Sequence, residues 1–129
     1  MTTVPPVPPA SVLVVDDDED VRALVALHLL MSGFTVREAA TVDAGLTSLE
    51  ALPPQVVLTD LNFGPDSGER IVRRCRERGL PVILMTASAE TRELAKDLRS
   101  DLVILRKPFA LDDVNASIAT LLAAGDHHD

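Results

Sequence analysis

Short runs of apolar residues alternate along the chain with longer segments in which apolar and polar positions mix. Four of these runs are almost continuously apolar over strand length, as is typical of strands covered on both faces of a sheet. A fifth segment alternates apolar and polar positions and predicts a short, half-buried strand. The predicted strands cover residues 11–15, 34–38, 55–60, 81–86 and 102–105.

The segments between the strands carry helix signals. Acidic residues precede the apolar pattern that follows the first strand, Thr41 is placed to cap a second helix, and Asp66 or Ser67 is placed to cap a third. Gly33 and Gly79 mark the ends of the first and third helices. The predicted helices run over residues 18–31, 41–52, from 66 or 67 to 78, 88–98 and 110–122.

The alternation of five strands with five helices defines the fold class. It predicts an α/β domain, a doubly wound (βα)5 unit with a five-stranded parallel sheet, because right-handed crossovers lay helices on both faces. Parallel strands end at the same edge, where open sheets of this kind bind their ligands. Five polar residues that follow or end strands are therefore expected to gather there: Asp16, Asp17, Asp60, Thr86 and Lys107.

Length and composition predict one ordinary domain. A chain of 129 residues with 47% hydrophobic content buries a sizeable core and leaves little room for a second domain. Residues 1–10 are proline-rich and are expected to form a flexible tail, residues 11–124 form the domain, and residues 125–129 form a short tail. We therefore expect a protein that acts without a separate output domain.

The charge of the chain limits the classes of partner that it is expected to bind. A net charge of −8 and a pI near 4.7 argue against direct contact with nucleic acid or an anionic membrane surface. The apolar runs are too short to cross a bilayer, and the amino end lacks the features of a signal peptide. Cys75 is the only cysteine and is interpreted as a buried structural thiol. These features predict a cytoplasmic protein.

The polar edge of the sheet suggests phosphoryl chemistry. Three neighbouring carboxylates repel one another unless a cation holds them ionised, and Mg²⁺ prefers such oxygen ligands. The backbone carbonyl of Asn62 is placed to add another oxygen. With the negative charge offset, Asp60 is able to attack phosphorus as a nucleophile. Lys107 then pairs with the phosphoryl group, and the Thr86 hydroxyl donates a hydrogen bond to it.

Taken together, the chain resembles the receiver domain of two-component response regulators. No single motif is specific to this family, but the combination of motifs is. The resemblance extends from residue 11 to about residue 124. The matching features are the apolar run 12–15 followed by Asp16 and Asp17, Asp60 at the end of the third strand, Gly68 eight residues later, the segment Met85, Thr86 and Ala87, and the segment Lys107, Pro108 and Phe109.

The resemblance implies more than the residues alone indicate. It implies a flavodoxin-like strand order of 2-1-3-4-5, a cis peptide bond before Pro108, and phosphorylation of Asp60 by the phosphohistidine of a histidine kinase or phosphotransfer protein. It also implies a downstream protein target, and we expect a monomer or a weak homodimer. The Mg²⁺ ligands implied by the family are Asp16, Asp17, Asp60 and the carbonyl of Asn62.

Several positions depart from the family pattern. Phe63 and Gly64 stand where the family usually carries Met-Pro, and Ser67 replaces a usual Asp or Asn. These changes predict a different loop after the phosphorylated residue. Ile104 stands where an aromatic residue commonly swings inward on activation, and residues 100–101 replace a common Gly-Ala. Phosphorylation is therefore predicted more firmly than the usual way of transmitting it.

Three functions compete on this basis. The first is a phosphorylation-dependent switch, or its variant, a phosphorelay intermediate, with no enzymatic activity beyond its own phosphorylation and dephosphorylation. In this interpretation residues 18–20 simply start a helix. The second is a haloacid-dehalogenase-like phosphatase with Asp16 as nucleophile and Asp18 as acid and base. The third is a receiver that acts as a constitutive interaction module without regulated phosphorylation.

Overall fold

Strands and helices follow one another as the sequence predicts. The computed structural model describes residues 10–87 and 102–125. The main strands are β1 Ser11–Val15, β2 Thr35–Ala39, β3 Val56–Asp60, β6 Val82–Thr86 and β7 Leu102–Arg106. The helices are α1 Glu19–Met31, α2 Val42–Ala51, α3 Glu69–Arg78 and α5 Leu111–Gly125, and a small hairpin of β4 Asn62–Phe63 and β5 Asp66–Ser67 follows β3.

Most predicted elements are confirmed, with ends that differ by a few residues. Helix α5, for example, extends to Gly125, and β2 begins at Thr35. The predicted helix over 88–98 lies outside the described residues, as do nearly all of the proline-rich tail, residues 100–101 and the last four residues of the chain.

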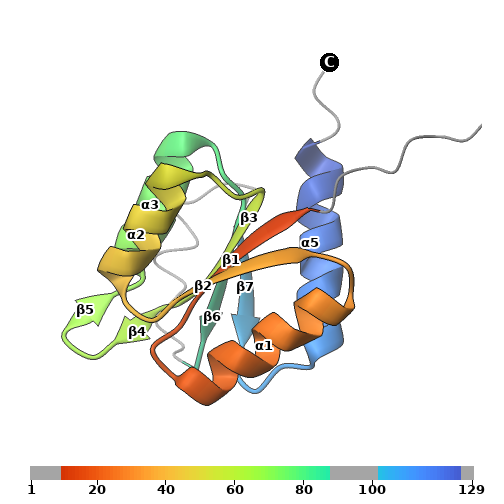
Figure 1. Cartoon of the computed structure of the whole chain (residues 1–129), viewed down its shortest axis with the longest axis horizontal. Helices are drawn as coiled ribbons and strands as arrows, with labels where there is room; N and C mark the ends of the chain where they lie inside the picture. Colours follow the sequence, from red (N-terminus) through yellow and green to blue (C-terminus); the bar gives the residue numbers. More distant parts are fainter. Residues whose placement is uncertain (1–9, 88–101, 126–129) are drawn as a thin grey trace, which may run out of the picture.

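The main strands form a single parallel sheet in the order β2-β1-β3-β6-β7 (Figure 1). Without the hairpin, this is the order 2-1-3-4-5, so the prediction of a flavodoxin-like fold is confirmed. The register brings the ends of neighbouring strands together, because Asp60 pairs with Met85, and Thr86 pairs with Arg106. The peptide bond between Lys107 and Pro108 is cis, as the family resemblance implies.

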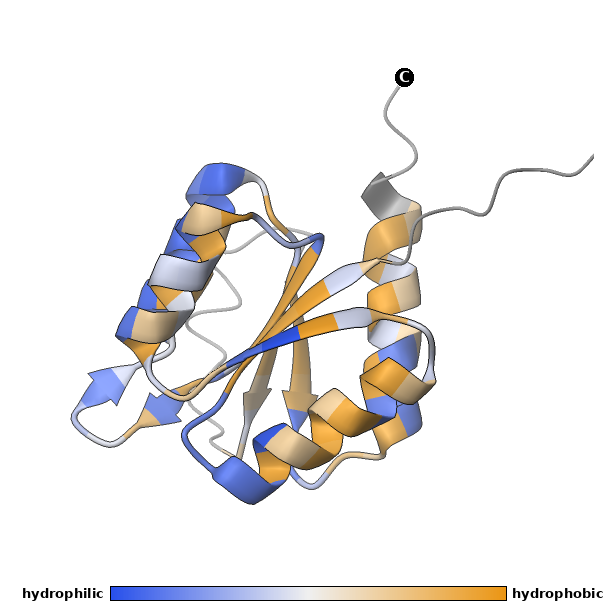
Figure 2. Cartoon of the chain, in the orientation of Figure 1, coloured by the Kyte–Doolittle hydropathy of each residue, from blue (hydrophilic) through white to orange (hydrophobic). Residues whose placement is uncertain are grey.

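Helices cover both faces of the sheet and form two cores. Helices α2 and α3 lie on one face, and α1 and α5 lie on the other (Figure 1). Alternate residues of β3 point to opposite faces, so Val57 joins the α2–α3 core, whereas Val56 and Leu58 join the α1–α5 core. The strands are therefore apolar along most of their length (Figure 2). Cys75 is fully buried in the α2–α3 core, which supports its interpretation as a structural thiol.

The first two helices begin as predicted. The side chain of Asp18 accepts hydrogen bonds from the amides of Asp20 and Val21 at 3.0 and 3.1 Å, so Asp18 caps α1. The hydroxyl of Thr41 accepts a hydrogen bond from the Ala44 amide at 3.0 Å and caps α2. Such caps satisfy amide groups that have no partner within the helix. None of the helices in the described ranges has the length and apolar character needed to cross a membrane.

The start of α3 differs from the prediction. Either Asp66 or Ser67 was expected to cap this helix, but its N-cap is Gly68, which has no capping side chain. The two polar residues instead form β5, which pairs with β4 in the antiparallel hairpin. The Ser67 hydroxyl still accepts a hydrogen bond from the Glu69 amide, at 3.1 Å. The capping prediction was therefore wrong, because the chain uses these residues to turn back toward β3 before the helix begins.

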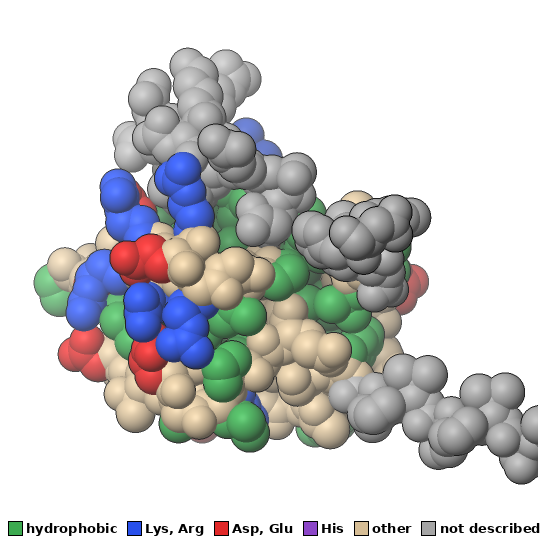
Figure 3. Space-filling view, turned by 90° about the horizontal axis from the view of Figure 1, so that it is seen from above, with side chains coloured by type: hydrophobic (Ala, Val, Ile, Leu, Met, Phe, Trp, Pro, Cys, Tyr) green, Lys and Arg blue, Asp and Glu red, His purple; other side chains and the backbone are tan. Residues whose placement is uncertain are grey.

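Ion pairs connect the outer surfaces of α2 and α3. Glu50 of α2 pairs with Arg74 and, at 2.8 Å, with Arg78 of α3. Figure 3 shows acidic and basic side chains gathered together on one part of the surface seen from above. The hydrogen bond from Arg74 is the main cause that lowers the pKa of Glu50 below its ordinary value. These groups are solvent-exposed, so their contribution to stability is small.

The start of α3 packs directly on the end of β3. The Gly68 amide donates a hydrogen bond to the Leu61 carbonyl at 2.7 Å. A Cβ atom at position 68 would lie only 1.9 Å from the backbone oxygen of Asp60. Only glycine therefore allows the helix to begin this close to the strand.

We expect Gly68→Ala to lower the free energy of unfolding by about 3 kcal/mol or more, because the new methyl group overlaps a backbone oxygen that cannot easily move. Urea denaturation followed by circular dichroism measures this change. Gly79→Ala provides the comparison: Gly79 has a φ of 68° but open space around it, so only backbone strain of roughly 1–2 kcal/mol is expected there. Equal losses in the two variants would contradict the close-packing explanation.

Candidate functional site

Four neighbouring strands bring polar side chains to the same edge of the sheet. Asp16 follows β1, Asp60 ends β3, Thr86 ends β6 and Lys107 follows β7. These strands are adjacent in the order β1-β3-β6-β7, so the four residues lie in a row across the edge. The residues named from the sequence are therefore gathered where parallel topology places them.

Three carboxylates form a tight cluster at this edge. Carboxylate oxygens of Asp16, Asp17 and Asp60 lie within 4.8 Å of one another. Asp16 is fully buried and Asp60 is 7% exposed, whereas Asp17 is exposed to solvent. The loop after β1 holds Asp16 in place, since its Oδ1 accepts a hydrogen bond from the Asp18 amide at 2.9 Å. The cluster thus has a buried side within the fold and an open side facing solvent.

Lys107 supplies positive charge to this cluster. Its Nζ lies 3.1 Å from Oδ2 of Asp60 and 3.7 Å from Oδ2 of Asp16. Its own amide donates a hydrogen bond to the Thr86 carbonyl at 2.8 Å, which ties its backbone to the neighbouring strand. Over the described part of the chain, Lys107 is the only cationic side chain that forms an ion pair with these carboxylates.

Burial and neighbouring charges together shift the pKa values of Asp16 and Lys107. Burial is the main cause that raises the pKa of Asp16, and the charges of Asp60 and Asp17 add to it, although the Asp18 amide and Lys107 act in the opposite direction. Burial alone lowers the pKa of Lys107, but the hydrogen bond and charge of Asp60 outweigh it with help from Asp16. The pKa of Lys107 is therefore raised, and its ammonium form is stabilised.

The cluster has the features expected of a divalent cation site. Oδ2 of Asp16 is buried and has no hydrogen-bond partner among the described residues. Leaving a buried polar atom unsatisfied costs roughly 1–3 kcal/mol, and more for a charged group. A hard cation removes that cost and the repulsion between carboxylates, and Mg²⁺ prefers oxygen ligands of this kind. Asp16, Asp17 and Asp60 thus fit a Mg²⁺ ion.

Asn62 and Thr86 lie close to these residues, but their predicted roles remain predictions. The Asn62 amide donates a hydrogen bond to Oδ1 of Asp60 at 3.3 Å, which places Asn62 directly beside the cluster. Its carbonyl stays a predicted ligand. Thr86 is fully buried at the end of β6, next to the backbone of Lys107. Its hydroxyl stays a predicted hydrogen-bond donor to a phosphoryl group.

Arg22 supports the site and was not found from the sequence. Its Nη1 donates a hydrogen bond to the Asp16 carbonyl at 2.8 Å, and its Nε pairs with Glu38 at 3.2 Å. The side chain therefore connects the loop after β1 to β2. An arginine within an ordinary amphipathic helix gives no signal of such a contact, because the contact depends on the relative placement of three elements.

These observations define a class: a doubly wound α/β domain with an acidic site at the carboxyl edge of its sheet. A family model for the response regulator receiver domain matches residues 12–119. The chain belongs to the response regulator receiver domain family.

Curated relatives support this assignment. The regulatory protein AtoC of Escherichia coli K12 is 34% identical over 116 residues, a match that covers 86% of this chain and 25% of AtoC. The regulatory protein PhoP of Bacillus subtilis is 29% identical over 115 residues, covering 86% of this chain and 48% of PhoP. The chain thus spans a quarter to a half of the length of these regulators. The expectation that it acts without a separate output domain stays untested.

Solved structures show the same fold. A response regulator receiver protein from Sinorhizobium medicae has a TM-score of 0.81 at 25% identity, with 90% of this chain and 96% of that chain covered. The response regulator TrrA from Thermotoga maritima, solved in complex with Mg²⁺ and BeF, has a TM-score of 0.77 at 23% identity, with 87% and 98% covered.

We expect Mg²⁺ to stabilise the folded chain, because the folded state alone brings the three carboxylates together. At a concentration 100 times its Kd, binding contributes about 2.7 kcal/mol. Thermal unfolding with and without MgCl2 measures the effect. Asp17→Asn should greatly reduce it, whereas Glu77→Gln, the same charge change on the exposed far end of α3, should preserve it. An equal stabilisation of Asp17→Asn would show that Mg²⁺ binds elsewhere.

Proposed function

We propose that the chain accepts a phosphoryl group on Asp60 from the phosphohistidine of a histidine kinase or phosphotransfer protein. The observation that carries this proposal is the arrangement around Asp60. Its carboxylate contacts Lys107 at 3.1 Å and lies within 4.8 Å of two further carboxylates, at the open edge of the sheet. Membership of the receiver family supports the same chemistry.

The proposed transfer is a displacement at phosphorus. A carboxylate oxygen of Asp60 forms a bond to phosphorus, and the P–N bond to the donor imidazole breaks. The electron pair of that bond goes to the imidazole nitrogen, which leaves as neutral imidazole when the other ring nitrogen carries a proton. The product is an acyl phosphate on Asp60.

The residues around Asp60 position it and balance charge, which is most of what phosphoryl transfer needs. Asn62 holds Oδ1 of Asp60 through its amide. Lys107 contacts Oδ2 and is placed to pair with the new phosphoryl group. The Thr86 hydroxyl is assigned a hydrogen bond to that group. A Mg²⁺ ion held by Asp16, Asp17 and Asp60, with the Asn62 carbonyl as a further ligand, supplies positive charge that offsets the carboxylates and phosphoryl oxygens.

The phosphorylated chain then switches a protein contact or relays its phosphoryl group. Its proposed direct partners are a phosphodonor protein and a downstream protein target. The net charge of −8 disfavours direct contact with nucleic acid. No enzymatic turnover beyond its own phosphorylation and dephosphorylation is proposed, and its proposed location is the cytoplasm.

The surroundings of Asp16 and Asp18 favour this function over a phosphatase that uses Asp16 as nucleophile. Asp16 is fully buried, whereas Asp60 keeps an exposed fraction of 7%. Asp18, the acid and base in that alternative, uses its carboxylate to cap α1. Asp60 instead pairs directly with Lys107 at 3.1 Å.

We expect acetyl phosphate with MgCl2 to label the chain at Asp60, because a small donor needs no docking partner. Intact-mass spectrometry should show one added phosphoryl group that is lost in Asp60→Asn, the isosteric variant without a nucleophilic oxygen. Glu77→Gln should be labelled like wild type. Labelling of Asp60→Asn at the wild-type level would exclude Asp60 as the acceptor. Phosphomonoester turnover that is lost only in Asp16→Asn would instead support the phosphatase.

A switch also requires that the modified chain change conformation. Beryllofluoride with Mg²⁺ mimics the phosphoryl group, so we expect it to shift the amide resonances of β7 and α5 in an ¹H–¹⁵N spectrum of wild type but not of Asp60→Asn. Shifts limited to residues beside Asp60 would favour a constitutive interaction module.

A further inference from the structure

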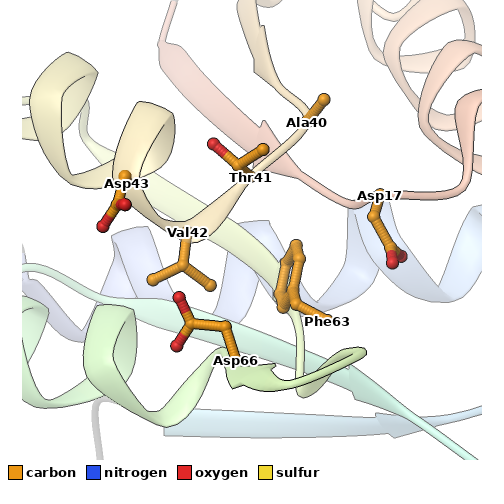
Figure 4. A pocket seen from close by; sticks show the side chains of 7 residues that line it. All are labelled: Asp17, Ala40, Thr41, Val42, Asp43, Phe63 and Asp66. Atoms are coloured by element: carbon orange, nitrogen blue, oxygen red, sulfur yellow. The ribbon is translucent and has the colours of Figure 1, made fainter.

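A pocket of about 230 Å³ opens beside the carboxylate cluster. It lies where three segments meet: the loop after β1, the first turn of α2, and the hairpin (Figure 4). In Figure 4 the ring of Phe63 stands between the side chains of Asp17 and Asp66, with Val42 facing the same space. Since Asp17 belongs to both the cluster and the pocket, an occupant of the pocket lies against the phosphoacceptor site.

The floor of the pocket is apolar and firmly held. Phe63 is 7% exposed and Val42 is 1% exposed, and both belong to the α2–α3 core. The pocket is smaller than the roughly 300–1,000 Å³ typical of sites for drug-sized molecules. It therefore suits one long side chain better than a cofactor. An aliphatic stem that lies on Phe63 and Val42 gains by leaving water.

The rim of the pocket is acidic. It carries the carboxylates of Asp17, Asp43 and Asp66. Arg70 pairs with Asp43 at 3.2 Å and with Asp66 at 2.7 Å, and within the described part of the chain it is the only cation paired with this rim. These two carboxylates thus already bind a guanidinium group. Arg70 contacts only Oδ1 of Asp43, whose side chain stays 82% exposed, so further acceptor capacity remains.

We propose that this pocket binds an arginine side chain from a protein that docks over the Asp60 edge of the sheet. The arginine stem packs on Phe63 and Val42, and its guanidinium donates hydrogen bonds to rim carboxylates. Arginine suits the pocket better than lysine, because a planar guanidinium can bridge carboxylates and stack on an aromatic ring. The identity of that protein as the phosphodonor rests on the proposed function.

N-acetylargininamide is a suitable probe for the pocket by itself. Excess MgCl2 occupies the carboxylate cluster, so that the cluster does not compete with the pocket for the probe. ¹H–¹⁵N spectra follow the amides of Val42 and Phe63 during the titration. We expect saturable shifts at these amides. The neutral isostere N-acetylcitrullinamide should bind about tenfold more weakly, because it loses charge-assisted hydrogen bonds.

Variants separate the pocket from general charge effects. Asp66→Asn, a substitution of nearly equal shape at a half-buried position, should weaken binding of the arginine probe about threefold. Glu77→Gln makes the same change in net charge at the far end of α3 and should leave binding unchanged. Absent or unsaturable shifts would overturn the proposal, as would equal binding of the citrulline probe or equal effects of the two variants.

This experiment fails independently of the proposed function, because it involves no phosphoryl group. If the chain binds the arginine probe but acetyl phosphate does not label it, the proposed arginine pocket stands and the assignment of Asp60 as acceptor fails. If the chain is labelled but shows no saturable shifts with the arginine probe, the assignment of Asp60 stands and the proposed arginine pocket fails.

Discussion

One ammonium group shared among three carboxylates is the interaction on which the site depends. Lys107 contacts both Asp60 and Asp16 but cannot neutralise the cluster alone. The remaining negative charge explains why the arrangement suits a divalent cation. The fold holds these carboxylates together despite their repulsion, because the parallel strands bring the ends of β1, β3 and β7 to one edge of the sheet.

The two faces of the sheet relate differently to Asp60. The hairpin that follows Asp60 is anchored by Phe63 in the α2–α3 core, and Gly68 starts α3 directly against the Asp60 backbone. Lys107 instead reaches Asp60 from the end of β7, next to α5. Ile104 of β7 packs against the α2–α3 core as a partly buried side chain. A β-branched residue has a restricted χ1 angle, so it is poorly suited to the inward swing assigned to an aromatic residue here.

Much of the fold and the core of the site were predictable from the sequence. Continuous apolar runs specify strands buried on both faces, and their parallel arrangement specifies that Asp16, Asp60 and Lys107 meet. The order of the strands came from the family resemblance, since hydrophobic patterns contain no information on which strands are neighbours. Thr41 and Asp18 cap their helices as local preference predicts.

The hairpin was not predictable in the same way. Strands as short as β4 and β5 have no measurable periodicity, and Asp66 and Ser67 are good N-cap residues in isolation. Tertiary contacts overrode that preference, because Gly68 alone fits against the Asp60 carbonyl. The orphaned oxygen of Asp16 and the contact of Arg22 with the Asp16 carbonyl depend on distances between separate elements, which no local pattern encodes.

The hydrogen bond from the Gly68 amide to the Leu61 carbonyl closes the base of the loop that holds the hairpin. The entropy of closing a loop grows slowly with its length, so the tip at Gly64 and Pro65 is open to insertion or replacement at small cost. Selection is thus free to change this part of the surface while the strand and helix on either side stay in place. A few residues exchanged at this tip therefore change the surface that the chain presents without changing its fold.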